Sequence, residues 1–475
     1  MPLAHIHPDH DLDLRRCATI RNALVRDGLF DVADQGAGTA RWRIAPTPFL
    51  LSQDQFRFFA SLGAHLLTFY RALDRLYRDS VRGTQPAWVA EYLDQGKPES
   101  LIAYSRTAGF ASALPAVIRP DVIPTDAGLV ITELDSVPGG IGLTSAMGKT
   151  YGQEGFDIVG GPDGMVAGFE RMVREQLDGR PGCLAIVVSE EADSYRPEMA
   201  WMAARLRARG LNAHCIAPEE ICATEDGLFF SGPEGDRPIG LIYRFFELFD
   251  LPNVPGVDRI MAAARKGQVA VTPPFKPALE EKLAFALFHH PILAPFWQDA
   301  LGSETFVVLS GLLPRTWILD PRPLPPVAVI PDLRIGGRAL ADWRDLAQAS
   351  QKQRRLVIKP SGFSPLAWGS RGVAVGHDLP QAEWAAVIDR ALASFPTTPH
   401  ILQEFHKGRQ FDLAYHRDGT EEIAPMAGRA RLSPYYFVIG GQAELAGVLA
   451  TVCSPEKKLI HGMRDAIMAP CALTR

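Results

Sequence analysis

The chain has 475 residues, of which 47% are hydrophobic and 22% are charged. That length predicts two to four domains, and the composition excludes a disordered or fibrous chain. The 49 basic and 54 acidic residues leave a net charge of −5, so nucleic acid is not expected as a main partner.

The six cysteines are scattered, and no CxxC pair occurs among them. Zinc and redox motifs need closely spaced cysteines, so a reduced, cytoplasmic protein is the favoured interpretation. The first 16 residues lack the apolar core of a signal peptide, and the uncharged stretch Leu283–Trp297 is too short to span a bilayer. We therefore expect a cytoplasmic protein that does not insert into a membrane.

Residues 1–112 are predicted to form a mainly helical N-terminal region. Within it, apolar residues recur at helical spacing over Asp54–Tyr77, which predicts a helix packed by one face on a core. In the next part, 113–180, the stretch Ala113–Asp135 predicts two strands around a turn.

Residues 181–275 alternate apolar strands with a helix, which predicts a Rossmann-like domain. The expected elements are a strand CLAIVV from Cys183, a helix Pro197–Arg209, a strand Asn212–Ile216 and a strand IGLIYRFF from Ile239. The first strand-to-helix turn, SEEADSY, has no glycine fingerprint, so we expect no dinucleotide binding there.

Residues 276–450 are predicted to contain two helices, two strands and a glycine-rich loop. The expected elements are a helix Ala278–Phe288, a strand ending at Lys359, the loop SGFSPLAWGSRG, a helix Gln381–Ser394 and a strand His400–Phe405. The proline-rich stretch 313–326 is expected to run over the surface as a connection.

Some fragments imitate known motifs but fail on spacing. Gly142–Thr150 (GLTSAMGKT) has five residues between its glycines, where a Walker phosphate loop has four. His416-Arg417-Asp418 copies the kinase catalytic triplet, but no asparagine follows at the required position, and Asp418-Gly419 favours a hairpin turn. The histidines within the first ten residues are expected to be solvated rather than metal-bound.

The two strands predicted within Ala113–Asp135 carry the most informative charges. Asp126-Ala127-Gly128 predicts a three-residue hairpin loop, so that the numbers of paired residues sum to 254. Asp121 then lies opposite Glu133, and Arg119 lies opposite Asp135. Because all four are two apart along their strands, they are expected to share one face.

Three carboxylates on one face repel each other, and a divalent cation would relieve that repulsion. Mg²⁺ prefers a few carboxylates together with substrate phosphates, so Asp121, Glu133 and Asp135 are predicted metal ligands. Arg119 would then hold a phosphate or a transferring phosphoryl group. The alternative is a solvated hairpin whose arginine pairs with the acids, and these residues alone do not decide between the two.

The C-terminal half adds a pattern that suits a nucleotide. Lys359 ends an apolar strand ahead of the glycine-rich loop, where an ammonium and backbone N–H groups can meet phosphates. The strand end Gln403-Glu404-Phe405 offers backbone groups to an adenine edge and Glu404 to a ribose, and Lys282 is a second predicted phosphate contact. Singly, these residues have plainer interpretations as a snorkelling lysine, a strand end and a solvated helix residue.

The order Lys282, Lys359-Pro360, glycine-rich loop and Gln403-Glu404-Phe405 resembles the ATP-grasp fold, in which two α+β subdomains clasp ATP. Ordinary members carry their metal ligands, an acid and then Glu-x-Asn, after the adenine strand, and no Glu-x-Asn follows residue 405 here. A matching set stands early instead, as Arg119-x-Asp121 and Glu133-x-Asp135. That order is similar to circularly permuted ATP-grasp proteins, including the synthetase domain of glutathionylspermidine synthase.

The resemblance implies ATP and Mg²⁺ as cofactors and assigns the parts of the chain. It implies a mainly helical region at 1–112, a permuted metal-binding part at 113–180, a Rossmann-like domain preceding the grasp at 181–275, nucleotide-binding subdomains at 276–450 and a C-terminal segment at 451–475. Asp135 stands where the family has asparagine, and the five residues after it, SVPGG, stand where the glutathionylspermidine synthases have Ala-Asp-Thr-Pro.

The predicted site residues fall into catalytic, nucleotide-binding and metal-binding groups. They are Arg119, Arg371 and Arg431 (catalytic); Lys282, Lys359, Gly369, Ser370, Gly372, Gln403, Glu404 and Phe405 (nucleotide); and Asp121, Glu133 and Asp135 (metal). Arg371 lies on the predicted lid GSRG, although an exposed loop arginine is the alternative. Arg431 reaches nucleotide or substrate, or else pairs with Asp412.

The predicted activity is an ADP-forming ligase that joins a carboxylate to an amine through an acyl phosphate. The resemblance implies small-molecule substrates of the amino acid, peptide or polyamine class. Alternatives are an ATP-dependent phosphotransferase of the same fold, a non-catalytic nucleotide-binding protein, or two unrelated domains that separate the hairpin from Lys359. Arg244 is expected either to hold a substrate carboxylate or to pair with Glu247.

Overall fold

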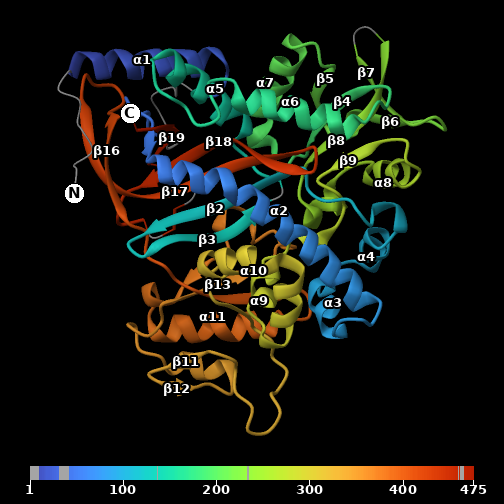
Figure 1. The fold of residues 1–475 in the computed structure, drawn as a ribbon, viewed down its shortest axis with the longest axis vertical. Helices are drawn as coiled ribbons and strands as arrows, with labels where there is room; N and C mark the ends of the chain where they lie inside the picture. The colour runs from blue at the N-terminus through green and yellow to red at the C-terminus, as the bar shows by residue number, and fades with distance from the viewer. Residues whose placement is uncertain are drawn as a thin grey trace.

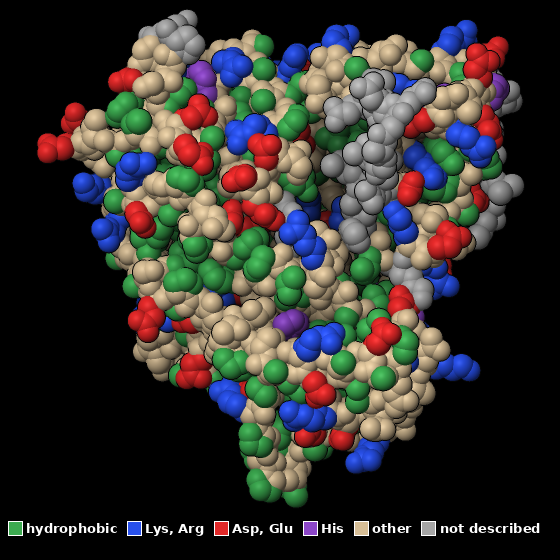
Figure 2. Space-filling view, turned by 180° about the vertical axis from the view of Figure 1, so that it is seen from behind, with side chains coloured by type: hydrophobic (Ala, Val, Ile, Leu, Met, Phe, Trp, Pro, Cys, Tyr) green, Lys and Arg blue, Asp and Glu red, His purple; other side chains and the backbone are tan. Residues whose placement is uncertain are grey.

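The structure, a computed structural model, describes residues 10–30, 42–135, 137–232, 235–457, 459–460 and 465–474. The described strands form sheets of seven, six, four and two strands. Figure 1 shows the smaller lobe, with β13 and α11, lying below the large sheet, and the β2–β3 hairpin facing that lobe. In the view of Figure 2, basic and acidic side chains are interspersed over the surface.

The seven-stranded sheet is built from both ends of the chain. Its order is β1-β19-β18-β17-β2-β3, and β16 pairs with β17. The strands are β1 (Phe49–Leu51), β2 (Val117–Thr125), β3 (Gly128–Asp135), β16 (Gln410–His416), β17 (Ile423–Ile439), β18 (Gln442–Cys453) and β19 (Ala466–Leu473). Strand β2 therefore pairs with a strand that begins about 300 residues later, through pairs such as Val122 with Leu432.

Helices cover both faces of this sheet, because its strands alternate apolar side chains toward two cores. One face packs on α2 and α10, and the other on α1, α5 and α6. The helices of these layers and the two short ones that follow α2 are α1 (His10–Arg26), α2 (Gln53–Val81), α3 (Ala87–Asp94), α4 (Glu99–Ser105), α5 (Ile141–Gln153), α6 (Gly164–Leu177) and α10 (Ala294–Leu312).

Two of these helices bear on the sequence predictions. Helix α2 confirms the helix expected over Asp54–Tyr77 and is capped by reciprocal hydrogen bonds between Ser52 and Gln55. The Walker-like fragment Gly142–Thr150 lies inside α5, so it forms no phosphate loop. Among the early histidines, His5 and His7 lie outside the described residues, and the ring of His10 contacts the carbonyl oxygen of Glu421.

The six-stranded sheet has a parallel part that confirms the expected strand alternation. Strands β4 and β5, β4 and β8, and β8 and β9 all pair in parallel, and an antiparallel β6–β7 extension was not predicted. The elements are β4 (Cys183–Val188), α7 (Arg196–Ala208), β5 (Ala213–Ile216), β6 (Ile221–Ala223), β7 (Leu228–Gly232), β8 (Gly235–Phe245), α8 (Val257–Arg265) and β9 (Ala270–Thr272).

The four-stranded sheet, in the order β10-β15-β13-β14, forms the smaller lobe with α11 on one face. Its elements are β10 (Thr316–Ile318), β13 (Leu356–Pro360), β14 (Ala374–Val375), α11 (Gln381–Ala393) and β15 (His400–Glu404), with the short hairpin β11 (Arg334–Ile335) and β12 (Arg338–Ala339) beside it. The stretch 313–326 was predicted as connection alone, but β10 lies within it and pairs with β15.

The helix predicted over Ala278–Phe288 is wrong as a single element. A 3-10 turn covers Pro277–Glu280, Glu281 is extended, and the helix α9 covers only Leu283–Phe288. The break has a physical reason, because the consecutive residues Glu280, Glu281 and Lys282 each form an ion pair with a different part of the molecule. Lys282 still stands at the start of the helix, as predicted.

Candidate nucleotide site

The hairpin pairs its charged residues as the sequence predicts. Arg119 lies opposite Asp135, and Asp121 lies opposite Glu133. The predicted three-residue loop is wrong, because Thr125 pairs with Gly128 around a two-residue turn. A bulge at Thr132 adds one residue to β3 and restores the predicted register.

Asp121 is buried, and three side chains surround its carboxylate. Arg431 and Ser433 of β17 donate to its two oxygens at 3.1 Å each, and the guanidinium of Arg119 lies 3.4 Å away. Burial opposes ionisation, but Arg431 and Arg119 outweigh it and hold the pKa of Asp121 below its ordinary value. Arg431 thus pairs with Asp121 rather than with Asp412, and the catalytic prediction for it is untested.

Asp135 binds the same arginine more closely. Arg119 Nη2 lies 2.7 Å from Asp135 Oδ2, and the backbone N–H of Val137 donates to Oδ1 at 2.9 Å. Burial raises the pKa of Asp135, with Glu133 and Asp121 adding to the rise and Arg119 opposing it. Arg119 is therefore fixed between two carboxylates on one face of the hairpin.

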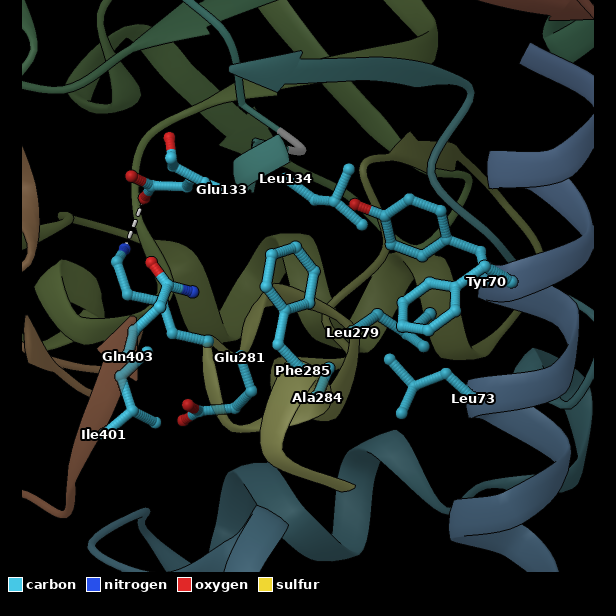
Figure 3. A pocket seen from close by; sticks show the side chains of 13 residues that line it. Tyr70, Leu73, Glu133, Leu134, Leu279, Glu281, Ala284, Phe285, Ile401 and Gln403 are labelled. Atoms are coloured by element: carbon cyan, nitrogen blue, oxygen red, sulfur yellow. Dashed lines mark hydrogen bonds and ion pairs between the residues drawn. The ribbon is translucent and has the colours of Figure 1, made fainter. Parts of the chain in front are cut away.

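Glu133 forms an ion pair with Lys282. The two residues are 149 positions apart in the sequence, and Lys282 reaches the hairpin from the start of α9. Burial disfavours the charged lysine, but Glu133 outweighs it and raises the pKa of Lys282 above its ordinary value. Figure 3 shows this pair as a dashed line beside Glu133.

Lys359 also reaches the hairpin, from β13 in the smaller lobe. Its ammonium donates to the carbonyl oxygen of Thr132 at 3.0 Å and to Gln403 Oε1 at 2.8 Å. Thr132 is the bulged residue of β3, and its carbonyl accepts this hydrogen bond from another lobe. Burial lowers the pKa of Lys359 to about 8. The hairpin and Lys359 therefore meet, which removes the hypothesis of two unrelated domains.

The predicted adenine strand ends beside Lys359. Gln403 is buried, and its amide also donates to Thr316 Oγ1 at 3.2 Å. The backbone N–H groups of Glu404 and Phe405 already donate to Arg315 and Arg355 carbonyls. The Glu404 carboxylate is 44% exposed and lies 3.7 Å from His406. Glu404 is thus the member of this group whose side chain is open to a ligand.

The predicted lid, Gly369–Gly372, forms a tight turn that begins ten residues after Lys359. Gly369 and Ser370 both have positive φ values, and Gly372 donates its N–H to the carbonyl of Leu366 at 2.8 Å. Arg371 points to the six-stranded sheet, where it forms a 3.2 Å ion pair with Glu191. Both partners are more than a third exposed, so the contact is a weak surface pair.

A pocket opens between the hairpin, α2, α9 and the smaller lobe. Its wall is largely apolar, and Figure 3 shows Tyr70, Leu73, Leu279, Phe285 and Ile401 around it. Glu133, Lys282 and Gln403 stand at its polar end. The pocket thus joins an apolar wall to cationic and amide groups, and its open space has room for about one water molecule.

Some site residues were not found from the sequence. Ser433 lies two residues beyond Arg431 on β17, so strand alternation would have placed both on one face. Thr132 gave no signal, because a bulge cannot be read from this sequence. The interpretation of Arg244 as a substrate contact is not supported, because it is fully buried and ion-paired with Glu280 rather than Glu247.

The donor chemistry fits Mg²⁺, because three carboxylates face one side of the hairpin. Their arrangement does not yet form a metal cage: among the residues that the structure describes, no three histidine, cysteine, aspartate or glutamate side chains converge enough to hold an ion. Cations occupy the carboxylates instead, with Lys282 at Glu133 and Arg119 between Asp121 and Asp135.

No protein-family model and no curated protein matches the chain. Solved structures do resemble it, including a glutathione synthetase-like effector from Globodera pallida in its apoform, with a TM-score of 0.57, 12% identity and coverage of 100% of both chains. Another is a protein from Methylobacillus flagellatus provisionally described as a gamma-glutamylcysteine synthetase, with a TM-score of 0.42, 11% identity and coverage of 89% of both chains.

The first likeness covers the entire chain and shows that the chain shares its overall fold with the Globodera protein. This is a mixed α/β fold with several sheets, as the sequence predicts. Within the described ranges, none of the helices has the length and apolar character that crossing a membrane requires.

Proposed function

We propose that the chain is an ATP-dependent carboxylate–amine ligase of the circularly permuted ATP-grasp type. One observation carries the proposal: two lysines from different parts of the chain, Lys282 and Lys359, both bind the arginine- and carboxylate-bearing hairpin, and Lys282 also lines the pocket beside it. Two ammonium groups held at one hairpin suit a nucleotide, whose phosphates are anionic.

In this proposal the smaller lobe binds ATP. Lys359 and Lys282 bind the α- and β-phosphates, and the strand end Gln403-Glu404-Phe405 meets adenine and ribose. Its support is the position of Lys359 beside Gln403 and the exposed carboxylate of Glu404. Gly369, Ser370 and Gly372 would form a lid over the phosphates, and Arg371 would leave Glu191 to reach them.

Asp121, Glu133 and Asp135 are the proposed ligands of Mg²⁺, which would neutralise phosphate charge when bound. Each carboxylate would have to exchange a present partner for the ion. At Glu133 the exchange would release Lys282, which could then bind a phosphate. Without ATP, Glu133 and Lys282 thus neutralise each other. With MgATP, Glu133 would bind the metal ion and Lys282 would bind a phosphate.

The proposed chemistry has two steps. A substrate carboxylate oxygen attacks the γ-phosphorus, the bond to the β,γ-bridging oxygen breaks, and ADP leaves with an acyl phosphate formed. A neutral amine then attacks the acyl carbon, the carbon–oxygen bond to phosphate breaks, and the amine proton is lost to solvent. Arg119 would stabilise the transferring phosphoryl group, since its guanidinium is already fixed on the hairpin. Arg431 would assist through its contact with Asp121.

The permutation is part of the proposal, and the topology supports it. In the seven-stranded sheet, β2 and β3 come from near the beginning of the chain and pair with β17 from near its end. An early acidic hairpin thereby joins late strands, as the order of the motifs predicts. The name of the Globodera protein makes amino acids and short peptides the first carboxylates to screen, with amino acids and polyamines as amines.

The test is substrate-dependent release of ADP from MgATP, with the product identified by mass spectrometry. The proposal predicts that one carboxylate–amine pair yields ADP, phosphate and an amide in equal amounts. ADP release with a stable phosphorylated acceptor and no amide would favour the phosphotransferase instead. Nucleotide binding without turnover across the whole screen would favour a non-catalytic nucleotide-binding protein.

A further inference from the structure

The seven residues Lys276–Lys282 connect several parts of the molecule through charged side chains, and we refer to them as the crossing segment. Four of its side chains make ion pairs, each with a different part of the molecule. The pairs are Lys276 with Asp74 on α2, Glu280 with Arg244 on β8, Glu281 with Lys97 between α3 and α4, and Lys282 with Glu133 on the hairpin.

Glu281 makes the most enclosed of these contacts. Its carboxylate and the Lys97 ammonium are 2.5 Å apart, and both side chains are 0% exposed. The same carboxylate accepts from Ser361 Oγ at 2.6 Å and from the backbone N–H of Gly362 at 3.2 Å. Glu281 therefore satisfies a buried lysine on one side and the beginning of the glycine-rich loop on the other.

The backbones meet at the same point. A Cβ on Gly362 would lie 2.0 Å from the carbonyl oxygen of Glu280, so only glycine allows this approach. The loop after Lys359 is thus packed directly on Glu280 and Glu281, the two residues before Lys282. Glu281 directly precedes Lys282, and Gly362 follows Lys359 by three residues. The contact between them therefore adjoins both lysines that are proposed to bind phosphate.

We infer that Glu281 is a positioning residue of the nucleotide site, which fixes the spacing between Lys282 and Lys359 and anchors the loop that covers the phosphates. This inference rests on the proposed function. Glu281 precedes Lys282 by one residue, and its partner Ser361 follows Lys359 by two. One buried carboxylate thereby sets both phosphate contacts, and its ion pair with Lys97 holds that carboxylate in place.

The test compares MgATP binding by calorimetry and thermal unfolding in three variants of the full chain. Glu281→Gln loses the acceptor for Gly362 and weakens the ion pair, and Ser361→Ala removes only the hydroxyl contact. Lys276→Met is the matched control, because it breaks another buried ion pair of the same segment away from the loop. We expect Glu281→Gln and Ser361→Ala to raise the Kd for MgATP about tenfold, and Lys276→Met to change it less than about twofold.

Each outcome decides the inference. Unfolding temperatures that fall in Glu281→Gln and Lys276→Met alike, with weaker MgATP binding only in Glu281→Gln and Ser361→Ala, support positioning. If Glu281→Gln does not fold, Ser361→Ala decides by itself. If wild-type protein binds MgATP and both variants bind it equally well, the inference is wrong but the proposed function stands. If wild type does not bind MgATP, both are wrong.

Discussion

The two sides of the candidate site satisfy their charges in opposite ways. On the large sheet, Arg119 and Arg431 are bound by carboxylates of the same hairpin. On the smaller lobe, the acceptors of Lys359 are a backbone carbonyl and an amide oxygen, both neutral. The first side is a fixed framework, and the second holds a cation to which no carboxylate of the described residues is hydrogen-bonded.

That difference suggests different roles for the two sides: the arginines orient the transferring phosphoryl group, and Lys359 binds a phosphate. An arginine held between two carboxylates costs little further ordering when a phosphoryl group arrives. A lysine with neutral acceptors keeps its attraction for a phosphate, because a phosphate is a stronger partner than an amide oxygen. Lys282 lies between these cases, since a single carboxylate, Glu133, binds it.

The largest expected effect is on the framework. Arg119→Met would leave Asp121 and Asp135 close together and short of a cation, and we expect a loss of about 3–5 kcal/mol in the free energy of unfolding. Urea unfolding of the variant measures this loss. Arg171→Met is the control, because Arg171 and Glu444 form an exposed pair worth less than about 1 kcal/mol. Equal losses in the two variants would contradict a framework role.

A second prediction concerns the pH dependence of binding. Lys359 has a pKa of about 8 without nucleotide, and a bound phosphate favours its charged form. MgATP affinity is therefore present below pH 8 and falls as pH rises through about 8, where binding must take up a proton. Calorimetry at pH 8.5 in two buffers of different ionisation enthalpy measures that uptake.

The control for this experiment is Lys359→Arg, whose guanidinium does not titrate in this range. Proton uptake should disappear in that variant while the cation remains. Uptake of the same size in the variant and in wild type would show that another group titrates, and would break the contrast between Lys359 and the carboxylate-bound cations.

A smaller effect is expected at the strand end. Glu404→Gln keeps the shape of the side chain but removes the charge that would accept from ribose hydroxyls, so the Kd for MgATP should rise about five- to tenfold. Because Glu404 is half exposed, unfolding should change little. The variant should also lose the preference of wild type for ATP over its deoxyribose analogue. An unchanged preference would remove Glu404 from the proposed ribose contact.

The smallest effect is expected for the lid arginine in the absence of substrate. Arg371→Ala breaks an exposed ion pair with Glu191, and the unfolding temperature should stay within about 1 °C of wild type. If the lid closes over phosphates, turnover should fall while MgATP binding stays within about twofold. Unchanged turnover would leave Arg371 as a plain surface residue.

The sequence predicted local pairings well and distant ones poorly. Arg119, Asp121, Glu133 and Asp135 were paired correctly, because a hairpin is fixed by neighbouring residues. Two deviations cancelled, since the shorter turn shifted the register by one and the bulge at Thr132 shifted it back. No periodicity announces a bulge, so the correct pairing was reached through an incorrect loop.

The contacts between lobes could not be predicted in this way. The hairpin partners of Lys282 and Lys359 lie 149 and 227 residues away in the sequence. The order of motifs suggested that they belong together, but only the fold brings them into contact. The role of Glu281 was not predicted for a related reason. The sequence predicted one continuous helix here, whereas Glu281 is extended and its side chain is buried against Lys97.

The most direct test of a single site is MgATP calorimetry on wild type, on Lys359→Ala and on a Glu133→Gln/Asp135→Asn double variant. The account predicts that wild type binds MgATP, that Lys359→Ala loses at least about 100-fold in affinity, and that the double variant loses its dependence on magnesium. Wild-type behaviour of the double variant would show that the hairpin is not the metal site and would contradict the permuted arrangement.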